Sequence, residues 1–261
     1  MTDNTPQDDE RAIAGIQVPF RAGPYFSTRT DDPATLGAYA ESVGRQVVRE
    51  ECEGWLRLGS DGGYELCVDP NNTVKAVLLD FEETDRFVNS SPEAFRYGLL
   101  ELRRTLEAIL STDDPQTASR AFDRLSESLR AQDPGAFGDR EDWWPLVLDD
   151  IRDTASAPNY AAFEYIGPDG TKQILTQSGA IGEHPEERLW STLHAAGVPA
   201  DRVQRIHTDL QPCFLPGHYC SLWLAEIFPD AQMTHTFPYG ETAASRAEGI
   251  RRLNESAVQG S

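Results

Sequence analysis

Long apolar runs are missing from this sequence. None of its 261 residues falls in a stretch of 18 consecutive apolar residues, which excludes a membrane-spanning helix of ordinary length. The first ten residues are polar and acidic, and they lack the basic n-region and apolar h-region of a secretory signal peptide. We therefore expect a cytoplasmic protein with no membrane partner.

Cysteine is scarce as well. Four cysteines in 261 residues are too few for a disulfide scaffold, so metal binding or simple burial is the expected use of each. Cys52 and Cys67 lie far in sequence from the other two cysteines and from every histidine, and we expect them to be buried small apolar side chains.

Basic residues are outnumbered, 23 against 43 acidic ones, for a net charge of −20. Residues 1–150 contain 30 acidic and 15 basic side chains, whereas residues 151–261 contain 13 and 8. No Lys/Arg-rich stripe occurs in either half, so a nonspecific grip on nucleic acid through counterion release is expected to be weak. The acidity favours solubility, or docking onto a basic protein.

The first 150 residues combine short strands with helices. Residues 64–68 and 74–80 predict a hairpin because turn-forming residues separate two runs typical of strands. Ser91 and Pro92 are a typical helix start, and a second helix is predicted from about residue 115 to 129. Trp143–Leu148 closes this unit as part of its core, and residues 153–158 are predicted to be a short linker.

The remainder of the chain alternates strands and helices. This order favours a sheet covered by helices. The predicted elements are a hairpin at 163–166 and 172–175, helices at 186–196, 220–228 and 246–256, and strands at 203–208 and 232–237.

All five histidines lie between residues 184 and 235, and two of the four cysteines lie there too. His184 and Glu186 open a predicted helix, Cys213 follows a strand, and Cys220 opens the next helix. One imidazole and two thiolates at this order and interval indicate a catalytic Zn²⁺ site with one open position for water. Zinc lowers the pKa of that water and so creates a hydroxide nucleophile, and Glu186 is placed to move its protons.

Six residues separate Cys213 from Cys220, whereas the commonest spacing in such signatures is two. Pro216 and Gly217 within this segment would allow a loop to bulge outward and return Cys220 to the metal. His218 is the alternative third ligand, and the spacing leaves open which of the two completes the site.

The segments His184-Pro185-Glu186, Arg205–Gln211 and Pro212-Cys213…Cys220 resemble the zinc deaminase superfamily. Together with Thr236–Gly240 they are similar to the nucleic acid/nucleotide deaminase domains of bacterial polymorphic toxin systems, over about residues 159–250. The resemblance implies an αβα layered fold around a mixed sheet, one zinc ion and deamination of a base. We expect at least one aromatic side chain to stack on that base, the candidates being Phe214, Tyr219, Phe237 and Tyr239.

Residues Trp55–Gly63, the hairpin after them and Phe87–Ser91 resemble the SUKH superfamily of immunity proteins, over about residues 11–150. That resemblance implies an α+β fold and a role in neutralising toxins by direct binding. A toxin or other target protein is therefore an expected partner of the acidic N-terminal half.

We therefore predict two domains. Residues 11–152 are expected to form an α+β SUKH-like domain, and residues 159–261 an α/β, three-layer, cytidine-deaminase-like domain. The predicted reaction is hydrolytic deamination of cytosine or adenine in a nucleoside, nucleotide or single-stranded nucleic acid. A duplex substrate is disfavoured because it demands base flipping and a cationic surface. The alternative is an immunity or toxin-binding protein in which the deaminase fold is a non-catalytic module stabilised by zinc.

Overall fold

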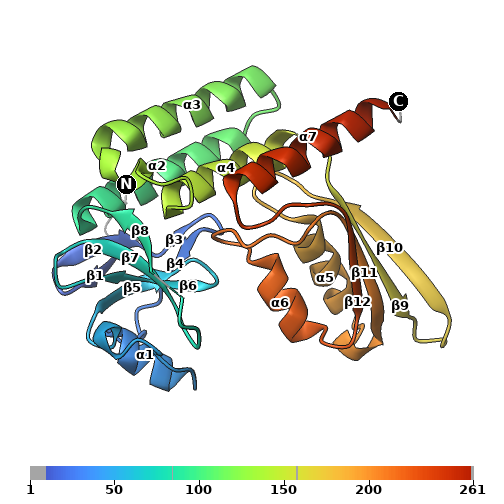
Figure 1. Cartoon of the computed structure of the whole chain (residues 1–261), viewed down its shortest axis with the longest axis horizontal. Coiled ribbons are helices and arrows are strands. Elements are labelled where there is room, and N and C mark those ends of the chain that lie inside the picture. Colours follow the sequence, from blue (N-terminus) through green and yellow to red (C-terminus); the bar gives the residue numbers. More distant parts are fainter. Residues whose placement is uncertain (1–9, 84, 157, 260–261) are drawn as a thin grey trace, which may run out of the picture. The chain divides into compact units, whose positions relative to one another are not determined.

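The computed structural model describes residues 10–83, 85–156 and 158–259 (Figure 1). The chain divides into two compact units, Met1–Leu148 and Asp149–Ser261. A search of the described helices for one long and apolar enough to cross a bilayer finds none.

The first unit is built on an antiparallel sheet of six strands in the order β3-β4-β5-β6-β7-β8, beside a separate β1-β2 hairpin. Its strands are β1 (Glu10–Ile13), β2 (Ile16–Pro19), β3 (Arg21–Ala22), β4 (Phe26–Ser27), β5 (Leu56–Ser60), β6 (Tyr64–Val68), β7 (Val74–Leu78) and β8 (Arg86–Asn89). Its helices are α1 (Leu36–Ser42), α2 (Pro92–Leu110) and α3 (Pro115–Gln132), with short 3-10 turns η2 (Glu50–Cys52) and η3 (Pro134–Phe137). The α+β class and the hairpin at 64–80 are confirmed.

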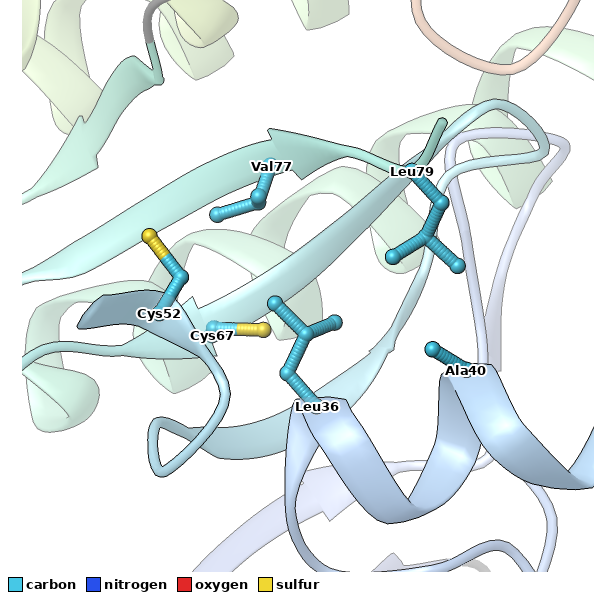
Figure 2. Packing of buried hydrophobic residues seen from close by; sticks show 6 residues of the cluster. All are labelled: Leu36, Ala40, Cys52, Cys67, Val77 and Leu79. Atoms are coloured by element: carbon cyan, nitrogen blue, oxygen red, sulfur yellow. The ribbon is translucent and has the colours of Figure 1, made fainter. Parts of the chain in front are cut away.

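Helix α1 packs its apolar side against the sheet. Leu36 and Ala40 from this helix meet Cys67 from β6 and Val77 from β7 in a fully buried cluster (Figure 2). Cys52 and Cys67 are both free thiols with 0 % exposure, so the expectation that they serve as small core residues is confirmed.

Helix α2 begins where its sequence predicts. The Ser91 hydroxyl accepts a hydrogen bond from the Ala94 backbone N–H at 3.2 Å, and Pro92 occupies the first turn. Asp114 caps α3 in the same way by accepting from the backbone N–H groups of Gln116 and Thr117. Both predicted helices are confirmed, although α3 extends to Gln132.

Two adjacent tryptophans fix the start of helix α4 (Trp143–Ser156) in the core of the first unit. The Trp143 indole donates to Asp61 at 2.8 Å, and the Trp144 indole donates to Asn89 at 2.8 Å. Asp61 also accepts from the Tyr64 backbone N–H at 2.7 Å, so it holds the β5–β6 turn as well. Both indoles are fully buried, which confirms that they are core residues.

The predicted linker at 153–158 is wrong over residues 153–156, because α4 continues to Ser156. The helix continues through these polar residues because Asp149, Asp150 and Asp153 are buried. Each of the three has a charged or hydrogen-bonding partner. Ala157 lies outside the described residues. The predicted boundaries of the two domains stay predictions.

The second unit contains a four-stranded sheet in the order β10-β9-β11-β12, with antiparallel pairs except for the parallel pair β11-β12. The elements are β9 (Tyr160–Ile166), β10 (Lys172–Ser178), α5 (Pro185–Ala195), the 3-10 turn η4 (Ala200–Arg202), β11 (Val203–Leu210), α6 (Cys220–Ile227), β12 (Gln232–Phe237) and α7 (Ala243–Gln259). The predicted mixed sheet with helices is confirmed.

Aromatic contacts pack α5 and the end of α6 against the sheet of this unit. The Phe228 ring, which follows α6, lies 5.6 Å from Phe163 of β9 and 4.9 Å from Trp190 of α5. Helix α7 packs closely against the backbone at Pro238. A Cβ atom on Gly249 of this helix would lie 2.0 Å from the Pro238 carbonyl oxygen. The start of α6 lies close to the segment after β11, because the Cys213 carbonyl accepts a hydrogen bond from the Ser221 backbone N–H at 3.0 Å.

A substitution at Gly59 in β5 would test how tightly the sheet of the first unit is packed. A Cβ atom there would lie 2.5 Å from the Ser27 carbonyl oxygen and 2.6 Å from the Phe26 ring. We expect Gly59→Ala to lower the free energy of unfolding by roughly 1–3 kcal/mol, as overpacking usually does. Urea denaturation would measure it, with Gly54→Ala as the control because no atom lies within 4 Å of its added methyl. Equal stability of the two variants would contradict this account of the sheet.

Candidate metal and catalytic site

Three buried side chains converge from different elements of the second unit. His184 is the N-cap of α5, Cys220 opens α6, and Cys213 lies in the segment after β11. The His184 Nδ1 atom lies 3.4 Å from the Cys213 Sγ and 3.3 Å from the Cys220 Sγ. Tetrahedral zinc with ordinary bond lengths separates a nitrogen and a sulfur ligand by about 3.6 Å. The trio therefore has the dimensions of a zinc ligand set.

The segment from Cys213 to Cys220 folds back on itself. The Cys213 carbonyl accepts hydrogen bonds from both the backbone N–H and the hydroxyl of Ser221, each at 3.0 Å. Gly217 with φ 86° and Tyr219 with φ 42° provide two left-handed residues that reverse the chain. The six-residue spacing is thus accommodated by a closed turn that returns Cys220 to His184.

The two thiols differ in ionisation. Burial raises the pKa of both, but for Cys213 the hydrogen bond from Cys220 and the charge on His184 outweigh it and hold the pKa well below its usual range. Burial and the neighbouring Cys213 raise the pKa of Cys220. The pair therefore favours one thiolate beside His184, the form in which cysteine binds a metal.

Glu186 lies in the first turn of α5 and is only 3 % exposed. Burial raises the pKa of its carboxyl to about 7. Its Oε2 atom is buried and has no hydrogen-bond partner within the described part of the chain. Such an atom costs free energy unless a ligand or water satisfies it, so this carboxylate is suited to a group that binds beside the trio.

A second group of buried polar side chains surrounds the Nε2 side of the His184 imidazole, the side opposite the two thiols. Asp150 lies 2.8 Å from the His184 Nε2 atom and 3.2 Å from the His218 Nε2 atom. Glu187 lies 2.9 Å from the His218 Nδ1 atom, and its carboxylate also accepts from the His184 backbone N–H at 3.1 Å. Histidines 184 and 218 stack with ring centroids 4.0 Å apart.

These contacts bear on the choice between Cys220 and His218. Both ring nitrogens of His218 face carboxylates, whereas the Cys220 sulfur faces His184 Nδ1. Asp150, His184 and His218 also form a possible metal-ligand group, but it uses the opposite side of the His184 ring from the thiols. The geometry supports Cys220 as the third member, and the assignment stays a prediction.

A cleft opens beside the trio and is lined in part by Asn159, Glu186, Cys213 and Tyr239. The Tyr239 hydroxyl donates to Asp153 at 2.7 Å. Phe214, Tyr219 and Phe237 are not among the lining residues, and the Phe214 and Tyr219 rings pack edge to face at 5.2 Å. Tyr239 is thus the predicted stacking residue that the structure places at the cleft.

Sequence reasoning missed Asp150, Asp153 and Glu187. The available signal was the position of three acids, 149, 150 and 153, within a pattern that continues the apolar helix from Trp143. An acid on the buried face of a helix requires a partner, and five histidines in the following segment offered one.

Comparison with known families agrees with this division of the chain. Residues 6–150 match the family model described as SUKH-4 immunity protein, and residues 156–256 match the one described as Xanthomonas-like deaminase. No curated protein and no solved structure matches the chain.

The buried hydrogen bond at the cleft wall is testable. We expect Tyr239→Phe to lower the free energy of unfolding by about 1–3 kcal/mol, because it leaves the buried Asp153 carboxylate short of a donor. Tyr165→Phe is the matched control, since it removes an exposed hydroxyl-to-Gln173 hydrogen bond of 2.8 Å and should cost less than about 0.5 kcal/mol. Thermal and urea unfolding would compare them, and a neutral Tyr239→Phe would contradict the role of this contact.

Proposed function

Because the chain belongs to the SUKH-4 immunity protein family over residues 6–150 and carries a deaminase-family domain over residues 156–256, we propose that it is a zinc-dependent hydrolytic deaminase joined to an immunity-type module. The substrate is a cytosine-type or adenine-type base in a nucleoside, a nucleotide or a single-stranded nucleic acid. The products are the corresponding carbonyl base and ammonia.

One observation carries this proposal: three thiol and imidazole ligand atoms meet next to a buried carboxylate oxygen that has no partner among the described residues. A structural zinc site ordinarily closes with four protein ligands, whereas three ligands leave a position for water. His184, Cys213 and Cys220 would hold the metal. Bound zinc supplies Lewis acidity, which makes water nucleophilic near neutral pH.

Glu186 does the proton chemistry in this proposal. It follows the His184 ligand by two residues in the first turn of α5, so its carboxylate reaches the same cleft without joining the ligand set. It accepts a proton from the attacking water and delivers it to the ring nitrogen of the base. It then assists transfer of a proton to the departing amino group, which leaves as ammonia.

The cleft and the charge of the chain limit the substrate. Tyr239 offers an aromatic ring, and the Asn159 Oδ1 atom is buried without a hydrogen-bond partner in the described residues, which suits a donor on the bound base. The net charge of −20 opposes a duplex, which requires a cationic surface and base flipping. A single exposed base fits these features best.

The second candidate function is a binding protein whose deaminase fold is a non-catalytic zinc-stabilised module. The observation that favours it is the extent of the SUKH-4 match, which covers more than half of the chain. A toxin or other basic protein would be the partner of the acidic N-terminal half. The buried carboxylate of Glu186 distinguishes the two functions, because a purely structural zinc site has no use for it.

The metal assignment is tested by elemental analysis of the full chain. We expect about one zinc per wild-type chain, since the ligand set is complete, and a loss of at least tenfold in occupancy after dialysis for His184→Ala. His207→Ala is the control, because this histidine is exposed and its ring hydrogen-bonds to Thr234 and Thr236 of β12. A wild-type chain that binds no zinc would overturn the metal site.

The catalytic assignment is tested by ammonia release from a panel of nucleosides, nucleotides and short single strands. We expect Glu186→Gln to retain zinc and to lose about 10²–10⁴-fold in rate, because the general acid–base group is gone. Glu226→Gln removes an exposed acid of α6 and should leave the rate unchanged.

Two outcomes of that experiment would overturn the enzyme. One is a zinc-loaded wild-type chain that releases no ammonia from any member of the panel. The other is turnover that Glu186→Gln leaves intact. Either result would favour the binding protein.

A further inference from the structure

We propose that Asp150 is the positioning residue of the metal site, and that the long segment between Cys213 and Cys220 serves to bring His218 against this carboxylate. The inference rests on the proposed zinc site. It concerns a residue that lies in α4, before the first residue matched by the deaminase family model.

The geometry at His184 assigns its two ring nitrogens to different partners. Asp150 is 1 % exposed, and a buried ionised carboxylate only accepts hydrogen bonds. Its 2.8 Å contact is therefore a hydrogen bond that His184 Nε2 donates. The other ring nitrogen, Nδ1, faces the two sulfurs at 3.3 and 3.4 Å. Asp150 thus fixes the rotation of the ring and directs Nδ1 toward the two thiols.

His218 completes the surroundings of Asp150. Its Nε2 atom lies 3.2 Å from the second Asp150 oxygen, and its Nδ1 atom lies 2.9 Å from Glu187. The Nδ1 atom hydrogen-bonds to Glu187 and the Nε2 atom makes an ion-pair contact with Asp150, so both ring nitrogens of His218 face carboxylates and neither faces the thiols. Its ring stacks on His184 at 4.0 Å with an angle of 11° between the planes, so it also blocks rotation of the ligand.

The long cysteine spacing follows from this arrangement. Backbone hydrogen bonds from the N–H groups of His218 and Tyr219 to the Leu215 carbonyl tighten the segment, and Ser221 ties its two ends at Cys213. If only two residues separated the cysteines, the segment would be too short to carry a histidine that stacks on the His184 ring and also contacts Asp150. The extra residues therefore supply a positioning group as well as a return path for Cys220.

Metal ligands of this kind usually depend on a hydrogen-bonded carboxylate, and its loss typically weakens metal binding by 10–100-fold. We expect Asp150→Asn in the full chain to weaken zinc binding by 10–100-fold in competition with a chromophoric chelator. Asp149→Asn is the matched control: this neighbour is also buried on α4, but its partners are Arg152 and Arg246. We expect its zinc affinity to equal that of the wild type.

The Co²⁺-substituted protein provides a spectroscopic readout that a loss of stability alone would not change. We expect Asp150→Asn to keep the two sulfur-to-metal bands and to shift the visible d–d bands, because the imidazole is reoriented. Asp149→Asn should reproduce the wild-type spectrum. Retained wild-type bands and affinity in Asp150→Asn would overturn the proposal.

Two substitutions of His218 keep the test decisive if Asp150→Asn does not fold. Gln places its amide nitrogen near the Nε2 position that faces Asp150, whereas Asn places it near the Nδ1 position that faces Glu187. We expect His218→Gln to retain zinc affinity better than His218→Asn, by about tenfold. The reverse order, or loss of a metal ligand from the Co²⁺ spectrum in both, would overturn the role assigned to His218. Failure of the wild type itself to bind zinc would instead count against the proposed function.

Discussion

The carboxylate of Asp150 is 1 % exposed and lies among side chains that have almost no access to water. An isolated buried carboxylate costs several kcal/mol, so the protein must surround it with donors. His184 supplies a hydrogen bond and His218 an ion-pair contact, from two different segments. Burial raises the pKa of Asp150, but these two histidines outweigh it and hold the pKa well below its usual range. The position of the His184 imidazole therefore follows from the need to satisfy this carboxylate.

The same constraint recurs along the second half of α4. Asp149 lies 3.4 Å from Arg246 of α7, Asp150 contacts His184 at the start of α5, and Asp153 accepts from Tyr239 after β12. Three buried acids of α4 thus contact three segments that are each distant from α4 in sequence. Each of these acids is buried, so each contact contributes to holding its own partner segment against α4.

Much of this could be predicted from the sequence. Turn residues predicted the hairpins, Ser91 and Pro92 predicted the start of α2, and the His184, Glu186, Cys213 and Cys220 signature predicted which side chains meet. The end of α4 could not be predicted, because Asp149, Asp150 and Asp153 look like a solvated helix end until their partners are known. The contact between His184 and Asp150 spans 34 residues, and nothing local in the sequence indicates it. Pairings of this kind depend on tertiary packing alone.

The family boundaries and the physical boundaries of the site do not coincide. The SUKH-4 match ends at residue 150 and the deaminase match begins at residue 156, yet the carboxylate behind the candidate metal ligand is residue 150. By its contacts Asp150 belongs with the second unit, which begins at Asp149. A deaminase segment defined by sequence similarity alone would therefore lack the group that orients His184. The second half of α4 is an integral part of the proposed catalytic unit, although neither family model assigns it there.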